Sequence, residues 1–383
     1  MALHFSDAEF DSRFERLKQS MESDKLDAML LFAQESMYWL TGYDTFGFCF
    51  FQCLVVTAEG EKVLLTRSAD ERQAKHTSNI RDIRIWVDRG GASPVGQLKE
   101  LLFDMDLLGS RIGVEYDTHG MTGKIGIELD GELKSFADLF DVSALIPGLR
   151  AVKSAEELVF VRKAAELGDA AFHAALSEIR PGADEGRILA AMQGAVFDGG
   201  GDYPGNEFII GSGRDALLCR YKSGRRTLDS QDQITLEWAG VYRRYHAALM
   251  RTVVIGAPTK RHEEMYAACR AALSAVEEEL VPGRTMGDVF DAHAKAMDAR
   301  DMMPHRLNAC GYSLGARFTP SWMDPPMAYK NNPTVLEPNM VIFQHMILMD
   351  SISEAAMCLG QTYLITQNAP ECLSRLPLDL PVK

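Results

Sequence analysis

A glutamate and a histidine lie close together in a segment whose pattern predicts two paired strands. Between residues 233 and 256 the chain reads QITLEWAGVYRRYHAALMRTVVIG, two apolar runs that flank a short turn, which we place at residues 240–243. Side chains alternate between the faces of a strand, so Glu237 on the first run and His246 on the second can face one cavity. A buried carboxylate has a raised proton affinity and an imidazole titrates near neutral pH, so this pair is suited to acid and base catalysis.

Strands that alternate with helices precede this hairpin. Before residue 145 the pattern predicts helices at 6–23 and 95–102 and strands at 28–32, 46–57, 61–66, 83–87 and 112–115. This alternation indicates an α/β domain. Pro147 and Gly148 then interrupt the periodicity, and Ser154 to Glu157 is a capping box that begins a long amphipathic helix. We therefore predict two domains, 1–148 and 149–383.

Composition and charge narrow the class of protein. A chain of 383 residues that is 46% hydrophobic can bury a large core. The formal net charge of −14 is spread along the chain, which disfavours a nucleic-acid partner. No apolar run has the length of a membrane span and no leader is recognisable, so we expect a soluble, cytoplasmic protein without a membrane partner. The seven cysteines include no C-x-x-C pair, which is typical of reduced thiols.

The hairpin resembles the core strands of the creatinase, prolidase and methionine aminopeptidase superfamily, the pita-bread enzymes. In that pattern an Asp is followed eleven residues later by a second Asp and then by Arg-Thr, and Arg251-Thr252 places these two positions at Glu237 and Ala248. The resemblance covers nearly the whole chain, more strongly from Arg150 onward. It implies an α/β (α+β) protein, with an N-terminal creatinase-like domain, a C-terminal pita-bread catalytic domain and a homodimeric assembly.

The other positions at which this superfamily binds metal also carry unusual residues. The segment 311–315, GYSLG, resembles the Gly-His-x-x-Gly turn, which puts Tyr312 in the place of a metal-binding His. By the same comparison His345 and Gly360 stand where two Glu ligands are expected. One carboxylate and one imidazole cannot bridge two dications, so the resemblance implies a site without a two-metal centre. A single metal on Glu237 and His345, with His246 nearby, is the alternative.

Two segments resemble the metal-free members of the superfamily, the creatinases and the bacterial ectoine hydrolases. The segment 40–44, LTGYD, and the GYSLG turn are similar to those of ectoine hydrolases, which makes Tyr43 a candidate for substrate binding. Arg220 aligns with an active-site His of prolidases and creatinases, and an arginine there suits a substrate carboxylate. Trp322 lies in the proline-rich segment TPSWMDPP and can wall the pocket.

From these residues we predict metal-independent hydrolysis of a non-peptide C–N bond in a small zwitterionic nitrogen compound, with no cofactor. Glu237 is the nucleophile, the base for water, or the group that binds a substrate cation; His345 or His246 carries the proton, and Tyr312 donates to a developing oxyanion. The alternatives are an Xaa-Pro peptidase that holds a metal through unrecognised ligands, and a catalytically inactive pita-bread protein that only binds. The identity of the substrate stays open.

Overall fold

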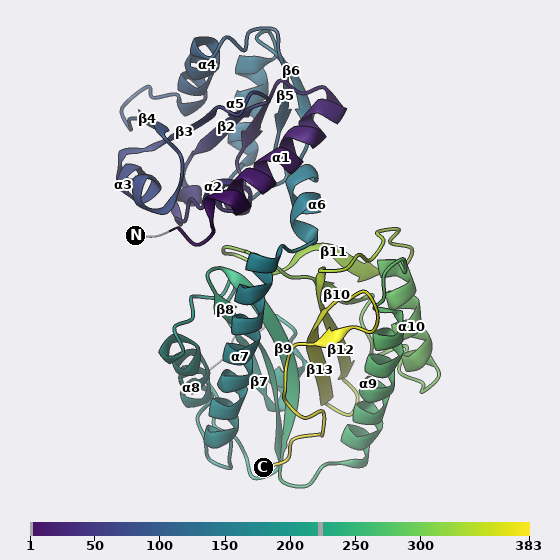
Figure 1. Ribbon diagram of the computed structural model, residues 1–383. Coiled ribbons are helices and arrows are strands. Elements are labelled where there is room, and N and C mark those ends of the chain that lie inside the picture. Colours follow the sequence, from purple (N-terminus) through teal and green to yellow (C-terminus); the bar gives the residue numbers. More distant parts are fainter. Residues whose placement is uncertain (1–2, 221–224) are drawn as a thin grey trace. The chain divides into compact units, whose positions relative to one another are not determined.

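The computed structural model describes residues 3–220 and 225–383, which divide into two compact units, Met1–Arg150 and Ala151–Lys383 (Figure 1). The predicted boundary, after residue 148, lies two residues before this division. Within these ranges, no helix has both the length and the apolar character that a membrane span needs.

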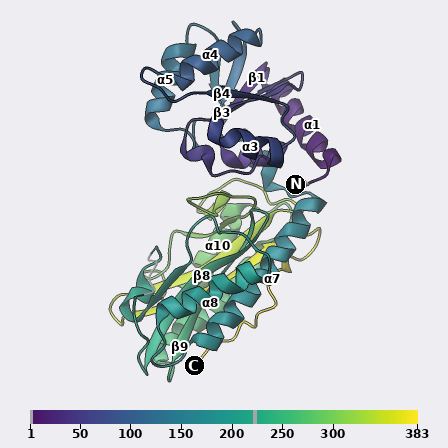
Figure 2. The same cartoon turned by 90° about the vertical axis from the view of Figure 1, so that its left-hand side faces the viewer.

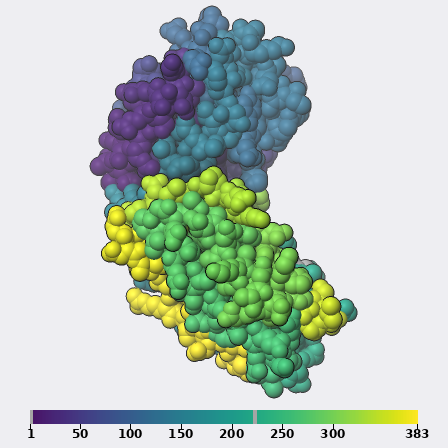
Figure 3. Space-filling model, turned by 90° about the vertical axis from the view of Figure 1, so that its right-hand side faces the viewer, coloured from purple at the N-terminus to yellow at the C-terminus, as the bar shows by residue number. Residues whose placement is uncertain are grey.

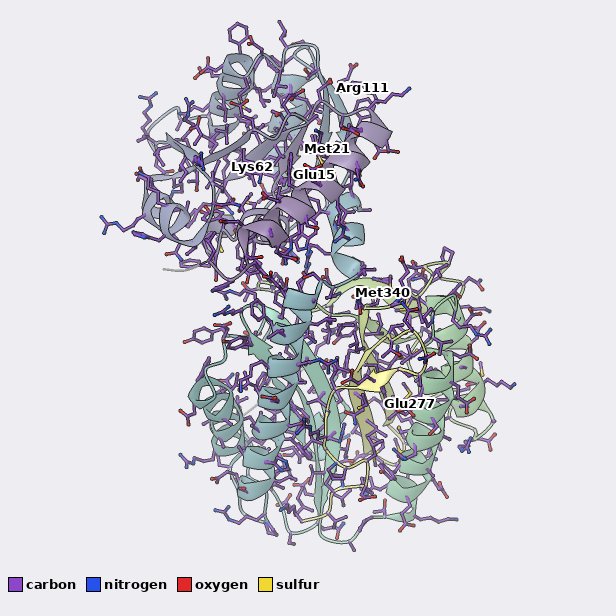
Figure 4. The ribbon with its side chains drawn as sticks, in the orientation of Figure 1. Glu15, Met21, Lys62, Arg111, Glu277 and Met340 are labelled. Carbon is purple, nitrogen blue, oxygen red and sulfur yellow. The ribbon has the colours of Figure 1, made fainter. Side chains whose placement is uncertain are left out.

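The N-terminal unit is a six-stranded mixed sheet between two layers of helices. Its strands run in the order β4-β3-β2-β1-β5-β6 and comprise β1 (Ala28–Leu31), β2 (Cys53–Thr57), β3 (Lys62–Arg67), β4 (Asp82–Trp86), β5 (Arg111–Val114) and β6 (Asp138–Asp141). The helices are α1 (Asp7–Asp24), α2 (Gln34–Thr41), α3 (Ser68–Thr77), α4 (Pro94–Asp104), α5 (Gly123–Leu133) and α6 (Leu145–Ala151). One apolar core, to which Met21 of α1 belongs, lies on one face of the sheet, and the core under α4 and α5 lies on the other (Figure 4).

The aromatic run after Asp44 corrects one expectation. Gly47–Cys49 form a short 3-10 helix, β2 begins only at Cys53, and Phe46 is 76% exposed. The hydroxyl of Thr45 holds this turn, because it accepts a hydrogen bond from the Gly47 amide at 2.9 Å and donates one to Asp70 at 2.8 Å. The prediction of a buried strand from residue 46 was wrong because an apolar run without alternation does not distinguish a strand from a turn.

The C-terminal unit is built on an eight-stranded antiparallel sheet covered by four helices. The strands run in the order β11-β10-β12-β13-β9-β8-β7, and β14 pairs with β13. They are β7 (Ile209–Ser212), β8 (Asp232–Tyr242), β9 (Tyr245–Ile255), β10 (Ala309–Ser313), β11 (Asp324–Tyr329), β12 (Val341–Asp350), β13 (Ala355–Leu364) and β14 (Glu371–Cys372). The helices are α7 (Ala155–Glu178), α8 (Glu185–Asp198), α9 (Lys260–Glu279) and α10 (Met286–Asp298). Figure 2 shows α7 and α8 side by side along β8.

The four helices pack on one face of this sheet and leave the other face free of helices. On the covered face the Trp238 indole donates to the Gly168 carbonyl of α7 at 2.8 Å, and Met346 and Leu359 belong to the core under α9 and α10. The surface of α9 and α10 is the green region of Figure 3. Glu277 of α9 ties its helix to β13, because its carboxylate accepts a hydrogen bond from Tyr363 at 2.5 Å (Figure 4). Because side chains alternate along strands, the neighbours of these strand residues point to the opposite face.

Gly240 explains why the hairpin turn was misplaced in the sequence. The turn consists of Arg243 and Arg244, which both have positive φ, and the pair Tyr242–Tyr245 closes it. Gly240 instead lies inside β8, where a Cβ atom would stand 1.8 Å from the Ala164 carbonyl oxygen of α7. The glycine is therefore required by the close approach of helix and strand, and not by a turn.

Candidate active site

Two of the predicted site residues, Glu237 and His345, share one row across four neighbouring strands. Glu237 of β8 pairs with Met250 of β9, Met250 pairs with Gly360 of β13, and Gly360 pairs with His345 of β12. Paired residues in a sheet project to the same side, so Glu237 and His345 lie on the face that the helices leave uncovered. The register inferred from Arg251-Thr252 therefore leads to one face of the sheet.

Tyr312 connects to this row from β10. Its hydroxyl donates to Oε1 of Glu237 at 3.4 Å and accepts a hydrogen bond from the indole nitrogen of Trp322 at 2.8 Å. Trp322 is 1% exposed and supports the Tyr312 hydroxyl, and its predicted part as a wall of the pocket stays a prediction. The tyrosine hydroxyl is thus held in one direction, with its proton aimed at the carboxylate.

Three aromatic rings fill the space at the other end of the row. Tyr312, Phe343 and His345 have ring centroids 5.3–5.6 Å apart. A Cβ atom at Gly360 would lie 2.7 Å from the Phe343 ring and 2.9 Å from Cβ of Met250. The ring of Phe343 therefore occupies the place that a side chain at position 360 would need.

Burial sets the protonation of these groups. Glu237 is 8% exposed, and desolvation raises its pKa to about 7, although the nearby charge of Arg220 and the Tyr312 hydrogen bond act in the opposite direction. Burial lowers the pKa of His345 to about 3 and raises that of Tyr312 well above its usual value. The histidine is therefore neutral near pH 7, and Glu237 is the group of the three that titrates there.

A loop that sequence reasoning missed joins His246 to the other site residues. The Gly205 amide donates to Nε2 of His246 at 2.8 Å, and the side chain of Asn206 accepts from the Trp322 amide at 3.1 Å. Nδ1 of His246 lies 3.3 Å from the Gly315 carbonyl, so backbone groups engage both ring nitrogens. Burial also lowers the pKa of His246 to about 3. His246 faces the same side of the sheet as Glu237, but its nitrogens are used to fix two loops.

The structure separates the two other predicted substrate contacts. Arg220 is exposed, lies near enough to Glu237 to lower its pKa, and places Nη1 4.0 Å from the sulfur of Met323. Tyr43 is 0% exposed in the N-terminal core, where its hydroxyl donates to Gln52 at 3.3 Å. Tyr43 therefore packs in the core of its unit, and the substrate contacts predicted for Tyr43 and Arg220 stay predictions.

The packing over Gly360 leads to a stability prediction. Gly360→Ala should destabilise the protein by about 1–3 kcal/mol, because the new methyl group meets the Phe343 ring. Gly194→Ala in α8 is the matched control: a Cβ there meets nothing within 4 Å, and alanine favours a helix. Thermal unfolding of both variants measures the difference. Equal melting temperatures for the two would show that the ring moves aside at no cost.

Comparison with known proteins matches both units to described domains. Residues 160–367 match the metallopeptidase family M24. The chain belongs to this family. Residues 13–152 match the creatinase/prolidase N-terminal domain. These matches confirm the predicted superfamily and its two-domain α/β architecture.

Relatives and solved structures of this M24 protein include enzymes of two kinds. It is 28% identical to the ectoine hydrolase of Halomonas elongata, over 100% of this chain and 99% of the relative. It is 21% identical to the Xaa-Pro dipeptidase of Pyrococcus furiosus, over 96% of this chain and 99% of that enzyme. The X-Pro aminopeptidase structure from Thermotoga maritima has a TM-score of 0.85 at 19% identity, covering 97% of this chain and 99% of its own. The protein is thus an M24-family hydrolase.

The family name implies a metal, and the residues at the family's ligand positions do not fit a two-metal centre. Ala248 offers no donor atom, and Gly360 has no side chain and no room for one beside Phe343. Within the part of the chain that the structure describes, no three His, Cys, Asp or Glu side chains gather closely enough to hold a metal ion. A single metal on Glu237, His345 and His246 also fits poorly, because backbone groups already engage both His246 nitrogens.

Proposed function

We propose that this protein hydrolyses a non-peptide C–N bond in a small zwitterionic nitrogen compound, such as the cyclic amidine ectoine, without a metal. The observation that carries the proposal is the row itself, in which one buried carboxylate, Glu237, faces the uncovered side while Phe343 fills the space over Gly360. A carboxylate with a pKa of about 7 can accept a proton near neutral pH and return it in the next step. The similarity to an ectoine hydrolase over the whole chain supports this substrate class.

In the proposed reaction Glu237 takes a proton from water while the oxygen forms a bond to the amidinium carbon. The protonated Glu237 then returns the proton to the leaving nitrogen and the carbon–nitrogen bond breaks. The added hydroxyl group loses its own proton to the released amine, so the products are an amide and an ammonium group. The Tyr312 hydroxyl donates to Glu237 and keeps the carboxylate in place. Once Glu237 is protonated, the same hydroxyl donates instead to the oxygen added to the carbon. His345, neutral at this pH, orients the substrate by hydrogen bonding.

Two opposite charges favour a zwitterion. Arg220 is exposed beside the buried Glu237, so a small molecule with one carboxylate and one cationic amidine can pair with both. A guanidinium offers two parallel donors to a carboxylate, which an ammonium of similar reach does not. We therefore propose that Arg220 binds the carboxylate of the substrate and Glu237 faces its amidine.

The experiment that tests the function combines metal analysis with turnover. Protein purified without added metal is assayed with ectoine, creatine and a Gly-Pro dipeptide in the presence of a chelator. We expect ring opening of ectoine, or hydrolysis of creatine, by protein that contains less than stoichiometric metal. Dipeptide cleavage that the chelator abolishes would replace the proposal with a metallopeptidase. Binding of a small zwitterion without turnover of any compound would indicate a protein that only binds.

The second candidate function is an Xaa-Pro peptidase. The similarity to the Xaa-Pro dipeptidase of Pyrococcus furiosus over nearly the whole chain favours it. It would require metal ligands other than the residues at positions 248 and 360, since alanine and glycine supply none. The dipeptide arm of the assay separates this candidate from the amidine hydrolase.

A further inference from the structure

A buried carboxylate outside the site holds both ends of the loop that carries Arg220. Glu185 begins α8 and is 0% exposed. Its Oε1 accepts hydrogen bonds from the Ser212 amide at 2.8 Å and from the Ser212 hydroxyl at 2.6 Å. Its Oε2 accepts from the amides of Arg225 and Arg226, each at 3.1 Å. One side chain therefore joins the residue that ends β7 to the residues at which the chain returns toward β8.

We call the hydrogen bonds of Glu185 to Ser212, Arg225 and Arg226 the clasp. A second charged group, the Arg226 guanidinium, connects the clasp to β8, the strand that carries Glu237. The Arg226 guanidinium donates to the Ser212 hydroxyl at 2.8 Å and forms an ion pair with Asp232, the first residue of β8. Asp232 precedes Glu237 by five positions on the same strand. The base of the loop is thereby tied to the element that places the carboxylate in the site.

The bonds of Glu185 are made to residues on both sides of Arg220 in the sequence. Arg220 lies between the two ends that Glu185 holds, Ser212 and Arg225. Ordering a loop costs conformational entropy, and joining its ends with buried, charge-assisted hydrogen bonds offsets part of that cost in advance of binding. A preorganised guanidinium binds a carboxylate more tightly than one that must be ordered by the ligand.

We propose that Glu185 is a positioning residue, which acts through Arg220 to set the affinity for the carboxylate of a zwitterionic substrate. This inference rests on the proposed function. Glu185 does not touch the substrate in this proposal, but it affects how tightly the substrate carboxylate is bound. Glu237 carries out the chemistry at the amidine.

The test measures KM for two substrates in matched variants. In Glu185→Gln the amide nitrogen cannot accept from the Arg225 and Arg226 amides, so the loop base loosens. We expect KM for ectoine to rise about tenfold with kcat within about twofold, and KM for the carboxamide analogue of ectoine to stay unchanged. Arg220→Ala should raise KM for ectoine more than KM for the carboxamide, and adding Glu185→Gln to it should not change that difference further.

Glu157→Gln is the matched control in the same unit. Glu157 is 2% exposed, caps α7 and accepts a hydrogen bond from Tyr245 at 2.6 Å. The Glu157→Gln variant should have a lower melting temperature, and the ratio of its KM values for ectoine and the carboxamide should stay that of the wild type. If Glu185→Gln does not fold, Ser212→Ala removes one donor to Glu185 and is expected to raise KM for ectoine about threefold, again without an effect on the carboxamide.

The outcomes separate this inference from the proposed function. An equal rise of KM for both substrates in Glu185→Gln, or no rise while Arg220→Ala still weakens ectoine binding, would overturn the positioning role and leave the proposed function intact. If both Arg220→Ala and Glu185→Gln still turn over ectoine and keep the wild-type ratio of the KM values for ectoine and the carboxamide, the role of the loop is overturned. Absence of turnover of any amidine would remove both proposals together.

Discussion

Replacing Glu237 with Gln should reduce kcat for the amidine substrate by about 10³-fold, because the amide cannot take a proton from water. Glu237 is the buried carboxylate of the row, and Tyr312 donates to it. The variant keeps the shape of the side chain, so the protein should still fold and bind. Steady-state kinetics with and without chelator measures the loss. Turnover at more than a tenth of the wild-type rate would remove Glu237 from the mechanism.

The same variant tests the pKa of Glu237. As a base it must be ionised, so kcat/KM of the wild type should rise with pH through about 7. Burial raises the pKa of Glu237 from 4.5 to about 7, so its contribution to stability is complete below 4.5 and is lost as the pH rises through 7. Glu237→Gln should therefore gain stability over the wild type between pH 5 and 8, on the order of 3 kcal/mol. A melting-temperature difference that does not change with pH would contradict this.

Tyr312→Phe should lower kcat by about 10²-fold, since it removes the hydroxyl donor closest to the carboxylate. It should also move the rise of kcat/KM to higher pH. The hydrogen bond from Tyr312 stabilises the ionised form of Glu237 and lowers its pKa, so its loss lets the pKa of Glu237 rise further. A pH profile of the variant measures both effects. An unchanged profile would mean that another group titrates.

Trp322→Phe is the control for that prediction. It leaves the Tyr312 hydroxyl in place and removes the indole donor behind it. We expect a loss of about tenfold in kcat with little movement of the pH profile, because the bond to Glu237 remains. A loss as large as that of Tyr312→Phe would mean that the indole, and not the hydroxyl, is the decisive donor.

Local patterns in the sequence were sufficient for the architecture. The capping box at Ser154 and Glu157 is present, with both hydrogen bonds formed. The alternation of strands and helices predicted the α/β N-terminal unit, and the matched domains confirm it. The Arg251-Thr252 register led to residues that share one face, because a sheet with period two converts a correct register into a correct face. The homodimer and the cytoplasmic location stay predictions.

Contacts between distant segments were beyond the reach of those patterns. Two such contacts are that of Phe343 with Gly360 and that of Asn206 with Trp322. Each joins residues from separate strands or loops, and no short sequence motif predicts it. Glu185 appears in the sequence only as a charged residue at a helix start. Gly240 misled the turn assignment because a glycine needed for helix contact looks the same in sequence as one needed for a turn.

The ring over Gly360 also has an evolutionary consequence. A lone Gly360→Glu change would drive a side chain into Phe343, and a lone Ala248→Asp change would add a second carboxylate to the face that holds Glu237, where like charges oppose each other. Each first step toward a two-metal site is therefore unfavourable until the others are in place. A descendant of this chain would have to change several residues together to acquire such a site. Selection acting on one substitution at a time therefore favours keeping the present residues at positions 248 and 360.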